Sequence, residues 1–243
     1  MSQGIIQEMK QQHHKESQTV GRRLFDIYNR LLVFYGPQHW WPAEEPFEVM
    51  VGAILTQSTA WRNVEKAIAN LKAAGALSPA ALRRLSLSEI AALIRPSGYY
   101  NAKSRKLKAL AEWLGGSYGD DIARMATQGT EKLRRQLLSV YGVGPETADS
   151  IILYVANQPV FVIDAYTRRI IDRLGLAPWQ ESYQAYQTLF MNNLPGDAKL
   201  FNEYHALLVQ LGKKFCRNLP LCTQCCLSDL CPISQVDKYI EGV

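Results

Sequence analysis

The stretch VYGVGPETA, residues 140–148, lies between two segments whose apolar residues recur at helical spacing. Gly142 and Gly144 permit a tight turn with exposed backbone. Pro145 fits the first turn of a helix, where its missing N–H costs no hydrogen bond. A helix that starts behind glycines presents unpaired N–H groups, which bind anions such as phosphate. Taken alone, the stretch favours an ordinary helical hairpin, because a G-x-G motif is weak by itself.

Helical spacing continues along most of the chain, so we predict an all-α fold. The segment PVFVI, residues 159–163, is the main exception, and it fits either a short strand or a buried connector. The first eighteen residues are polar, and we expect them to be frayed. The clearest helical patterns cover residues 24–35, 49–71 after a break at Pro46, 82–94, 103–114, 133–141 and 148–155.

Local signals place several ends of these helices. Ser78-Pro79 predicts a helix start, and the run RPSG at residues 95–98 predicts a turn. The helix from Lys103 to Leu114 is expected to close at Gly115-Gly116, because paired glycines disfavour helix continuation.

The overall composition is that of an ordinary globular protein. The chain has 243 residues, enough for one large or two small domains, with 47% hydrophobic and 20% charged residues. No apolar run reaches membrane-spanning length, and we expect no membrane partner. The formal net charge of +5 permits nucleic-acid binding without predicting it. A cytoplasmic, reducing location is the default expectation.

All five cysteines lie in one short stretch near the C-terminus. Four of them have the spacing C-x5-C-x2-C-x5-C, and Cys226 is the spare thiol. Disulfides are disfavoured because the N-terminal sequence lacks the apolar region of a secretion signal. Zinc usually takes two C-x2-C pairs, so it is the second choice. An iron–sulfur cubane fits best, with the ligands Cys216, Cys222, Cys225 and Cys231.

Asp164 follows four apolar residues, about twenty residues after the glycine hairpin. An acid at this place is either a helix N-cap or a partly buried catalytic carboxylate. Capping is the commoner role. The two roles are compatible, because a cap fixes the side chain.

The hairpin, the aspartate and the cysteine loop, in this order, resemble the helix-hairpin-helix DNA glycosylases of the endonuclease III superfamily. The resemblance spans about Leu24 to Cys231. It implies two helical domains with a DNA-binding cleft between them: a barrel from residues 38–158, and a domain from residues 1–37 and 159–243 that holds a 4Fe–4S cluster in the loop 216–231. It further implies that Gly142 and Gly144 bind a DNA phosphate, that Asp164 is catalytic, and that the four spaced cysteines bind the cluster. The family's first cysteine gap is usually one residue longer.

One departure from the family pattern predicts the type of reaction. Members that also cut the DNA strand carry a lysine two residues after the second hairpin glycine, and this lysine forms a Schiff base. Here that residue is Glu146, which cannot form an imine. No lysine stands beside the hairpin in the sequence. We therefore predict a monofunctional enzyme that uses water and leaves an abasic site.

Further motifs resemble the third type of bacterial 3-methyladenine DNA glycosylase. By this resemblance Trp40, Trp41, Pro42 and Trp61 would line the pocket for an extruded base. Without it, the tandem tryptophans would simply anchor a loop. Alkylated purines such as 3-methyladenine carry positive charge, and indole faces attract cations by about 0.5–2 kcal/mol. That type of enzyme lacks the iron–sulfur loop, so the match covers the pocket and the hairpin only.

Gln57 and Tyr99 match positions at which the superfamily inserts side chains into DNA, although each also fits a packing or capping role. Basic residues near the cysteines would contact phosphates or remain solvated: Lys213, Lys214 and Arg217. Arg168 and Arg169 are equally ambiguous.

The sequence therefore predicts a monomeric, monofunctional glycosylase for alkylated purines, with damaged double-stranded DNA as its partner. A strand-cleaving glycosylase for oxidised pyrimidines and a non-catalytic DNA-binding module are the alternatives.

Overall fold

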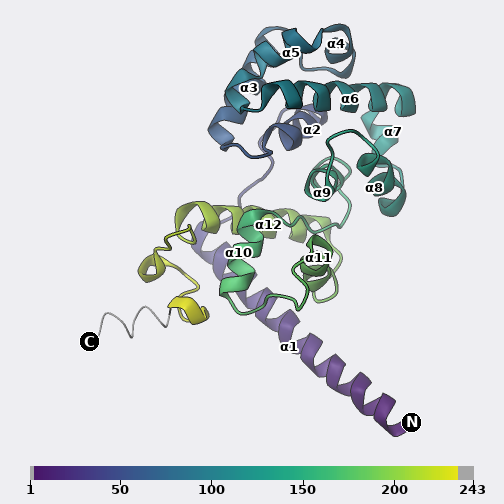
Figure 1. Ribbon diagram of the computed structural model, residues 1–243. Helices are drawn as coiled ribbons and strands as arrows, with labels where there is room; N and C mark the ends of the chain where they lie inside the picture. Colours follow the sequence, from purple (N-terminus) through teal and green to yellow (C-terminus); the bar gives the residue numbers. More distant parts are fainter. Residues whose placement is uncertain (1–2, 235–243) are drawn as a thin grey trace. The chain divides into compact units, whose positions relative to one another are not determined.

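The computed structural model describes residues 3–234, with side chains from residue 19. Every regular element in this part of the chain is helical, which confirms the predicted all-α class (Figure 1). None of these helices has the length and apolar character needed to cross a bilayer. The elements are α1 (Gln3–Tyr35), α2 (Pro46–Leu55), α3 (Trp61–Ala73), α4 (Pro79–Arg84), α5 (Leu87–Leu93), η1 (Arg95–Ser97), α6 (Tyr100–Tyr118), α7 (Ile122–Ala126), α8 (Thr130–Leu138), α9 (Pro145–Tyr154), α10 (Ala165–Arg173), α11 (Tyr183–Met191), α12 (Ala198–Lys214) and η2 (Cys222–Gln224).

The chain divides into two compact units. The middle unit consists of residues 41–160, and the outer unit combines the segment up to residue 40 with the segment from residue 161 onward. The predicted domains, a barrel of residues 38–158 and a second domain of residues 1–37 and 159–243, stay a prediction.

The middle unit is built around α6. This helix packs against α2, α4 and α5, and it buries Leu107, Leu110, Ala111 and Leu114 completely. The predicted start at Ser78 is confirmed, because its side chain accepts a hydrogen bond from the Ala81 N–H. α8 and α9 pack on one another as an antiparallel hairpin at the end of this unit. The helices of the middle unit thus hold both the predicted turn at residues 95–98 and the predicted glycine hairpin.

The outer unit joins the two ends of the chain. α1 and α10 both pack against α12, and the buried Tyr204 hydroxyl donates to the Leu24 carbonyl at 2.9 Å. The segment 160–163 is a buried connector and forms no strand. Its Phe161 ring stacks on Phe190 with 3.8 Å between centroids, so it fills the core of this unit.

Three expectations about the bounds of helices are wrong. Residues 3–18 are not frayed, because α1 runs from Gln3 as one continuous helix through residues with good helix propensity, such as Gln, Glu and Lys, whereas residues 1 and 2 lie outside the described part of the chain. The pattern at residues 49–71 is also not continuous. It breaks between α2 and α3, where Ser58 adopts a left-handed conformation with φ 53°.

The glycine pair 115–116 does not end α6 either. The helix continues to Tyr118 and stops at Gly119, whose φ of 65° provides the left-handed cap. Gly115 is needed inside the helix because a Cβ there would lie 2.6 Å from Arg83 Nη1. Gly115 thus makes room for the Arg83 side chain and does not end the helix.

Candidate active site

The predicted glycine hairpin is present in the middle unit. Gly142 has φ 81°, which side-chain-bearing residues rarely adopt, and Gly144 is the N-cap of α9 with Pro145 at its first position. Gly144 has no side chain, so no side-chain cap competes with an anion for the first-turn N–H groups. The local geometry is compatible with the phosphate site that the family resemblance implies, and phosphate binding stays a prediction.

A buried ion pair, which sequence reasoning missed, holds the hairpin together. Arg134 on α8 donates from Nε to one oxygen of Asp149 on α9 at 2.7 Å and from Nη2 to the other at 3.2 Å. The Asp149 side chain is completely buried. Loss of either partner would leave a buried charge uncompensated, which typically costs about 3–5 kcal/mol. This pair links the two helices of the hairpin.

Gln57 binds directly to the hairpin. Its Nε2 donates to the Gly142 carbonyl at 3.1 Å and to the Thr147 hydroxyl at 2.9 Å, while its Oε1 accepts from Lys106 Nζ at 2.6 Å. For Gln57 to insert into DNA, its hydrogen bonds to Gly142, Thr147 and Lys106 would have to break and be replaced by contacts with the DNA.

Lys106 corrects an expectation from the sequence. A Cβ at Gly142 would overlap the Lys106 side chain, so a lysine does stand beside the hairpin. It comes from α6, far away in the sequence, and no local motif announces it.

Tyr99 projects from a strained turn. It has φ 45° and caps the start of α6, directly after Gly98 with φ 64°. A left-handed conformation is costly for an aromatic residue. The side chain is nevertheless 72% exposed, so core packing does not explain it. An exposed aromatic side chain on this turn is compatible with the predicted insertion into DNA, which stays a prediction.

The turn that carries Tyr99 is fixed by a buried lysine. Lys103 is 2% exposed, and its Nζ donates to the carbonyls of Leu55 at 2.9 Å and Ser97 at 2.7 Å. These carbonyls lie at the ends of α2 and η1, where helix dipoles attract a cation. Burial, with a contribution from the charge of Lys106, lowers the pKa of Lys103 to about 8.

An aromatic cluster includes two of the predicted pocket residues. Trp41 contacts Trp61 and Tyr154 in T-shaped arrangements, with centroid distances of 5.3 and 5.4 Å. Trp41 also lies so close to Gly52 that a Cβ there would approach its ring to 2.9 Å. Pro42 is exposed beside them. The structure thus brings Trp41 and Trp61 together and adds Tyr154, which sequence reasoning missed.

Asp164 lies in the outer unit and caps α10, as predicted. Its Oδ1 accepts from the Thr167 N–H at 2.7 Å, and its Oδ2 lies 3.7 Å from Nε2 of His205 on α12. The Asp164 side chain is 14% exposed, and burial lowers the pKa of His205. The lowered pKa disfavours the charged form of the imidazole that lies beside this carboxylate. His205 was not predicted.

The two lysines at the end of α12 lie over aromatic rings of the outer unit. Lys213 Nζ is 5.6 Å from the centroid of Trp40, and Lys214 Nζ is 5.3 Å from the centroid of Tyr35. Each distance fits a cation–π contact. Trp40, the fourth predicted pocket residue, therefore has a cation of its own chain at its ring.

The four spaced cysteines line one cavity of the outer unit. Its other walls include Phe215, Leu221 and Ile233, whereas Cys226 does not line it. None of the five cysteines forms a disulfide. Within the described residues no three His, Cys, Asp or Glu side chains are arranged to hold a single metal ion. Cysteines spaced around a shared cavity suit a cluster, in which each thiolate binds a different iron, better than one ion.

Arginines of α10 hold the loop that carries these cysteines. Arg169 donates to the carbonyls of Cys216 at 2.8 Å and Gly212 at 3.2 Å. Arg173 donates to the Arg217 carbonyl at 2.6 Å and to Cys216 Sγ at 3.4 Å. Arg169 therefore has a structural role. The sequence alone had left open whether Arg169 contacts phosphates or is solvated.

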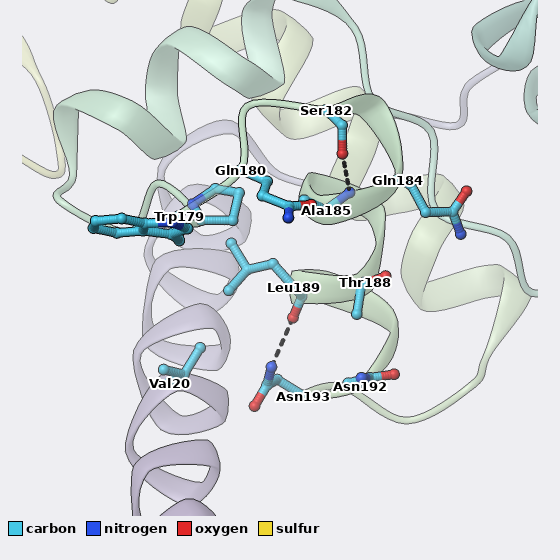
Figure 2. A pocket seen from close by; sticks show the side chains of 11 residues that line it. Val20, Trp179, Gln180, Ser182, Gln184, Ala185, Thr188, Leu189, Asn192 and Asn193 are labelled. Atoms are coloured by element: carbon cyan, nitrogen blue, oxygen red, sulfur yellow. Dashed lines mark hydrogen bonds between the residues drawn. The ribbon is translucent and has the colours of Figure 1, made fainter.

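A groove of about 940 Å³ elsewhere in the outer unit contains none of the predicted residues. It lies between α1 and α11, and Figure 2 shows Val20, Leu189 and the fully exposed Trp179 along it. Its lining has no ionisable side chain. The groove therefore offers no carboxylate, amine or imidazole that could act as an acid or a base.

Comparison with known proteins agrees with these features. Residues 51–195 match the family model of the HhH-GPD superfamily base excision DNA repair protein. MJ1434 of Methanocaldococcus jannaschii, which is named as a DNA repair glycosylase, is 44% identical over 209 residues, covering 86% of this chain and 95% of the relative.

Two solved structures have similar folds. The 3-methyladenine DNA glycosylase MagIII of H. pylori, bound to 1,N6-ethenoadenine, has a TM-score of 0.64 at 27% identity, covering 82% of this chain and 97% of that one. A trapped endonuclease III–DNA covalent intermediate has a TM-score of 0.77 at 21% identity, with 90% and 98% covered. The family match and the hairpin lead to one conclusion: the chain belongs to the HhH-GPD superfamily of base excision DNA repair proteins and is a DNA N-glycosylase.

Proposed function

We propose that this enzyme is monofunctional and hydrolyses the N-glycosidic bond of alkylated purines, such as 3-methyladenine, in double-stranded DNA. The observation that carries the proposal is the Asp164 carboxylate, which is fixed at a helix N-cap and lies beside a buried imidazole. A carboxylate so placed can stabilise positive charge that develops on a sugar.

The reaction begins with extrusion of the damaged base, which costs least for a base that is already poorly paired. In our proposal Tyr99 enters the vacated space and the hairpin around Gly142 and Gly144 holds a phosphate. The bond between the base nitrogen and C1′ then breaks, and both electrons leave with the base. Asp164 stabilises the positive sugar and receives a proton from the water whose oxygen bonds to C1′. An alkylated cationic base departs as a neutral molecule.

The monofunctional assignment rests on two side chains. Glu146 is exposed at the start of α9, where strand-cleaving members would carry the lysine nucleophile. Lys106 stands beside the hairpin, but its Nζ is bonded to Gln57 Oε1 at 2.6 Å. In our proposal an amine held in this hydrogen bond is not presented to a sugar carbon as a nucleophile.

The substrate assignment rests on the aromatic residues. We propose that Trp41 and Trp61, supported by Tyr154, form one wall of the base pocket with Pro42 beside them. We propose separately that Trp40 of the outer unit contacts the extruded base. The likeness to MagIII, a 3-methyladenine DNA glycosylase bound to 1,N6-ethenoadenine, supports this substrate class.

We also propose that Cys216, Cys222, Cys225 and Cys231 hold a 4Fe–4S cluster and that Cys226 is a spare thiol. The lining of the cavity by these four residues, and not by Cys226, supports this ligand set. The cluster would supply a structural cross-link for the loop and no step of base removal.

The deciding experiment is chromatography of bases released from methylated duplex DNA by the purified protein, together with borohydride trapping. Release of 3-methyladenine without a covalent adduct is the expected result. Release of oxidised pyrimidines with a trapped adduct would instead make this a strand-cleaving enzyme, and Lys106→Gln would then show whether Lys106 is its nucleophile. DNA binding without any base release would favour the non-catalytic module.

The cluster has its own test. Each of the four proposed ligands is changed to serine and compared with Cys226→Ser. We expect visible absorbance and bound iron in the wild type and in Cys226→Ser, and their loss in the four ligand variants. Stoichiometric zinc without iron would contradict the proposal.

A further inference from the structure

The charges of the outer unit are arranged around the proposed catalytic carboxylate. Asp164 lies 3.7 Å from His205, and the positive charge of Lys213 acts on the same His205, whose pKa it helps to lower. Lys213 also lies 5.6 Å from the centroid of the Trp40 ring. The Asp164 carboxylate and the Lys213 ammonium therefore both act on the buried imidazole of His205. The Lys213 ammonium also lies at the ring of Trp40, which is a proposed pocket residue.

Breakage of the glycosidic bond moves charge in a fixed direction. The sugar gains positive charge, and the base gains the electron pair of the bond. A negative group near the sugar and a positive group near the base both stabilise that displacement, and fixed charges in a partly dry site act strongly. Asp164 is the negative group near the sugar. A positive group that assists the same charge displacement has to lie near the base.

We propose that Lys213 is this counterpart: its ammonium contacts the extruded base and stabilises the electron pair that leaves with it. The proposal rests on the function proposed above, because Trp40 and Asp164 must flank the same base and sugar.

Two kinds of substrate respond differently to this lysine. A cationic base such as 3-methyladenine is repelled by Lys213 before the bond breaks, and the repulsion disappears as the base becomes neutral. A neutral base such as 1,N6-ethenoadenine is not repelled at first, and its developing negative charge is stabilised. Lys213 therefore increases the rate of bond breakage for both, but it weakens binding only of the cationic base.

The test compares Lys213→Gln with Lys214→Gln under single-turnover conditions. Lys214 is the matched control, because it lies in the same helical turn and its ammonium faces the Tyr35 ring at 5.3 Å. We expect Lys213→Gln to lower the bond-breaking rate by about 10- to 100-fold on both substrates, and to tighten binding of the cationic base only. Lys213→Arg should retain most of the rate. Lys214→Gln should leave the rate unchanged.

A second readout does not depend on activity. In an NMR titration the pKa of His205 should rise in Lys213→Gln and stay constant in Lys214→Gln. Equal rates in the two variants, or a His205 that titrates as in the wild type, would overturn the role of Lys213. A wild type that releases no alkylated purine contradicts the proposed function instead. The rate comparison then moves to oxidised pyrimidines, and the titration still decides where Lys213 acts.

Discussion

The two oxygens of Asp164 have different partners. One caps α10 through the Thr167 N–H, and the other faces His205. The capping half needs only a hydrogen-bond acceptor, whereas the proposed chemistry needs the negative charge. An amide in place of the carboxylate therefore separates the two roles.

We predict that Asp164→Asn folds normally and loses about 100- to 1,000-fold in the rate of base release, because asparagine still caps a helix but carries no charge. Single-turnover assays and thermal melting measure the two effects. The control is Asp197→Asn, which changes the N-cap of α12 in the same way. If Asp164→Asn keeps its full rate, Asp164 is only a cap.

Lys103 gives a prediction about stability and pH. Its pKa is lowered to about 8 in the folded protein, from 10.5. Between these values the unfolded chain binds more protons, so this group makes the free energy of unfolding rise with pH. The difference in that free energy between wild type and Lys103→Gln should thus grow by about 1–3 kcal/mol from about pH 7.5 to about pH 10.

Urea denaturation at the two pH values measures this difference. Lys108→Gln is the control, because the half-buried Lys108 also donates to two carbonyls, those of Arg83 and Leu85. We expect the difference in the free energy of unfolding between wild type and Lys108→Gln to change less with pH, because Lys108 is less buried than Lys103. If the difference in the free energy of unfolding between wild type and Lys103→Gln shrinks as the pH rises, the lowered pKa of Lys103 is contradicted.

Sequence patterns were informative at the residue scale where the signal is local. The Asp164 cap follows from an acid that comes directly before a helix. His205, Lys106 and Tyr154 carry no such signal, because what each of them contacts is decided by helices distant in sequence. Lys106 even contradicts an inference from sequence, since the turn of α6 that carries it packs on the hairpin.

At the scale of the element, α6 shows why a glycine pair can mislead. The local sequence Gly115-Gly116 predicts the end of a helix, but α6 continues through both residues to Tyr118. In the structure Gly115 makes room for Arg83, which is bonded to Asp120 at 2.6 Å, and nothing lies within 4 Å of the place where a Gly116 Cβ would be. The two neighbours therefore occupy the same helix for different reasons.

We predict opposite effects of alanine at these two positions. Gly116→Ala should raise the free energy of unfolding by about 0.5–1 kcal/mol, because alanine is the better helix former and the space is open. Gly115→Ala should lower it, because the new methyl group displaces Arg83 from Asp120. Chemical denaturation compares the pair directly. If both variants are stabilised, the contact with Arg83 contributes little.

Element ends with local chemistry were predictable, such as the Ser78 cap, the turn at Gly98 and the start of α9 at Pro145. Ends fixed by tertiary contacts were not. The gap between α2 and α3 belongs to this class, because its loop is held by the bonds of Gln57 to the hairpin.

At the scale of the molecule, α10 connects two sites of the outer unit. Asp164 lies at its N-terminus, and Arg169 and Arg173 near its C-terminus hold the cysteine loop. A change in the order of the loop should therefore reach the proposed catalytic carboxylate through one short helix.

We predict that Cys231→Ser, which removes a proposed cluster ligand, increases amide hydrogen exchange in α10 and in the segment 212–234, while α3–α6 of the middle unit keep their protection. Exchange measured by mass spectrometry tests this, with Cys226→Ser as the control. Uniform loss of protection across both units would show that the loop supports the whole fold rather than its own unit.

The make-up of the outer unit has a consequence during synthesis. α1 leaves the ribosome first, but α12, against which it packs, is made only after the whole middle unit. Domains form as their segments emerge, so the middle unit can fold while Leu24, Ile27 and Leu31 of α1 still lack their buried surroundings. The apolar face of α1 therefore gains the surface that covers it only after α12 has been made.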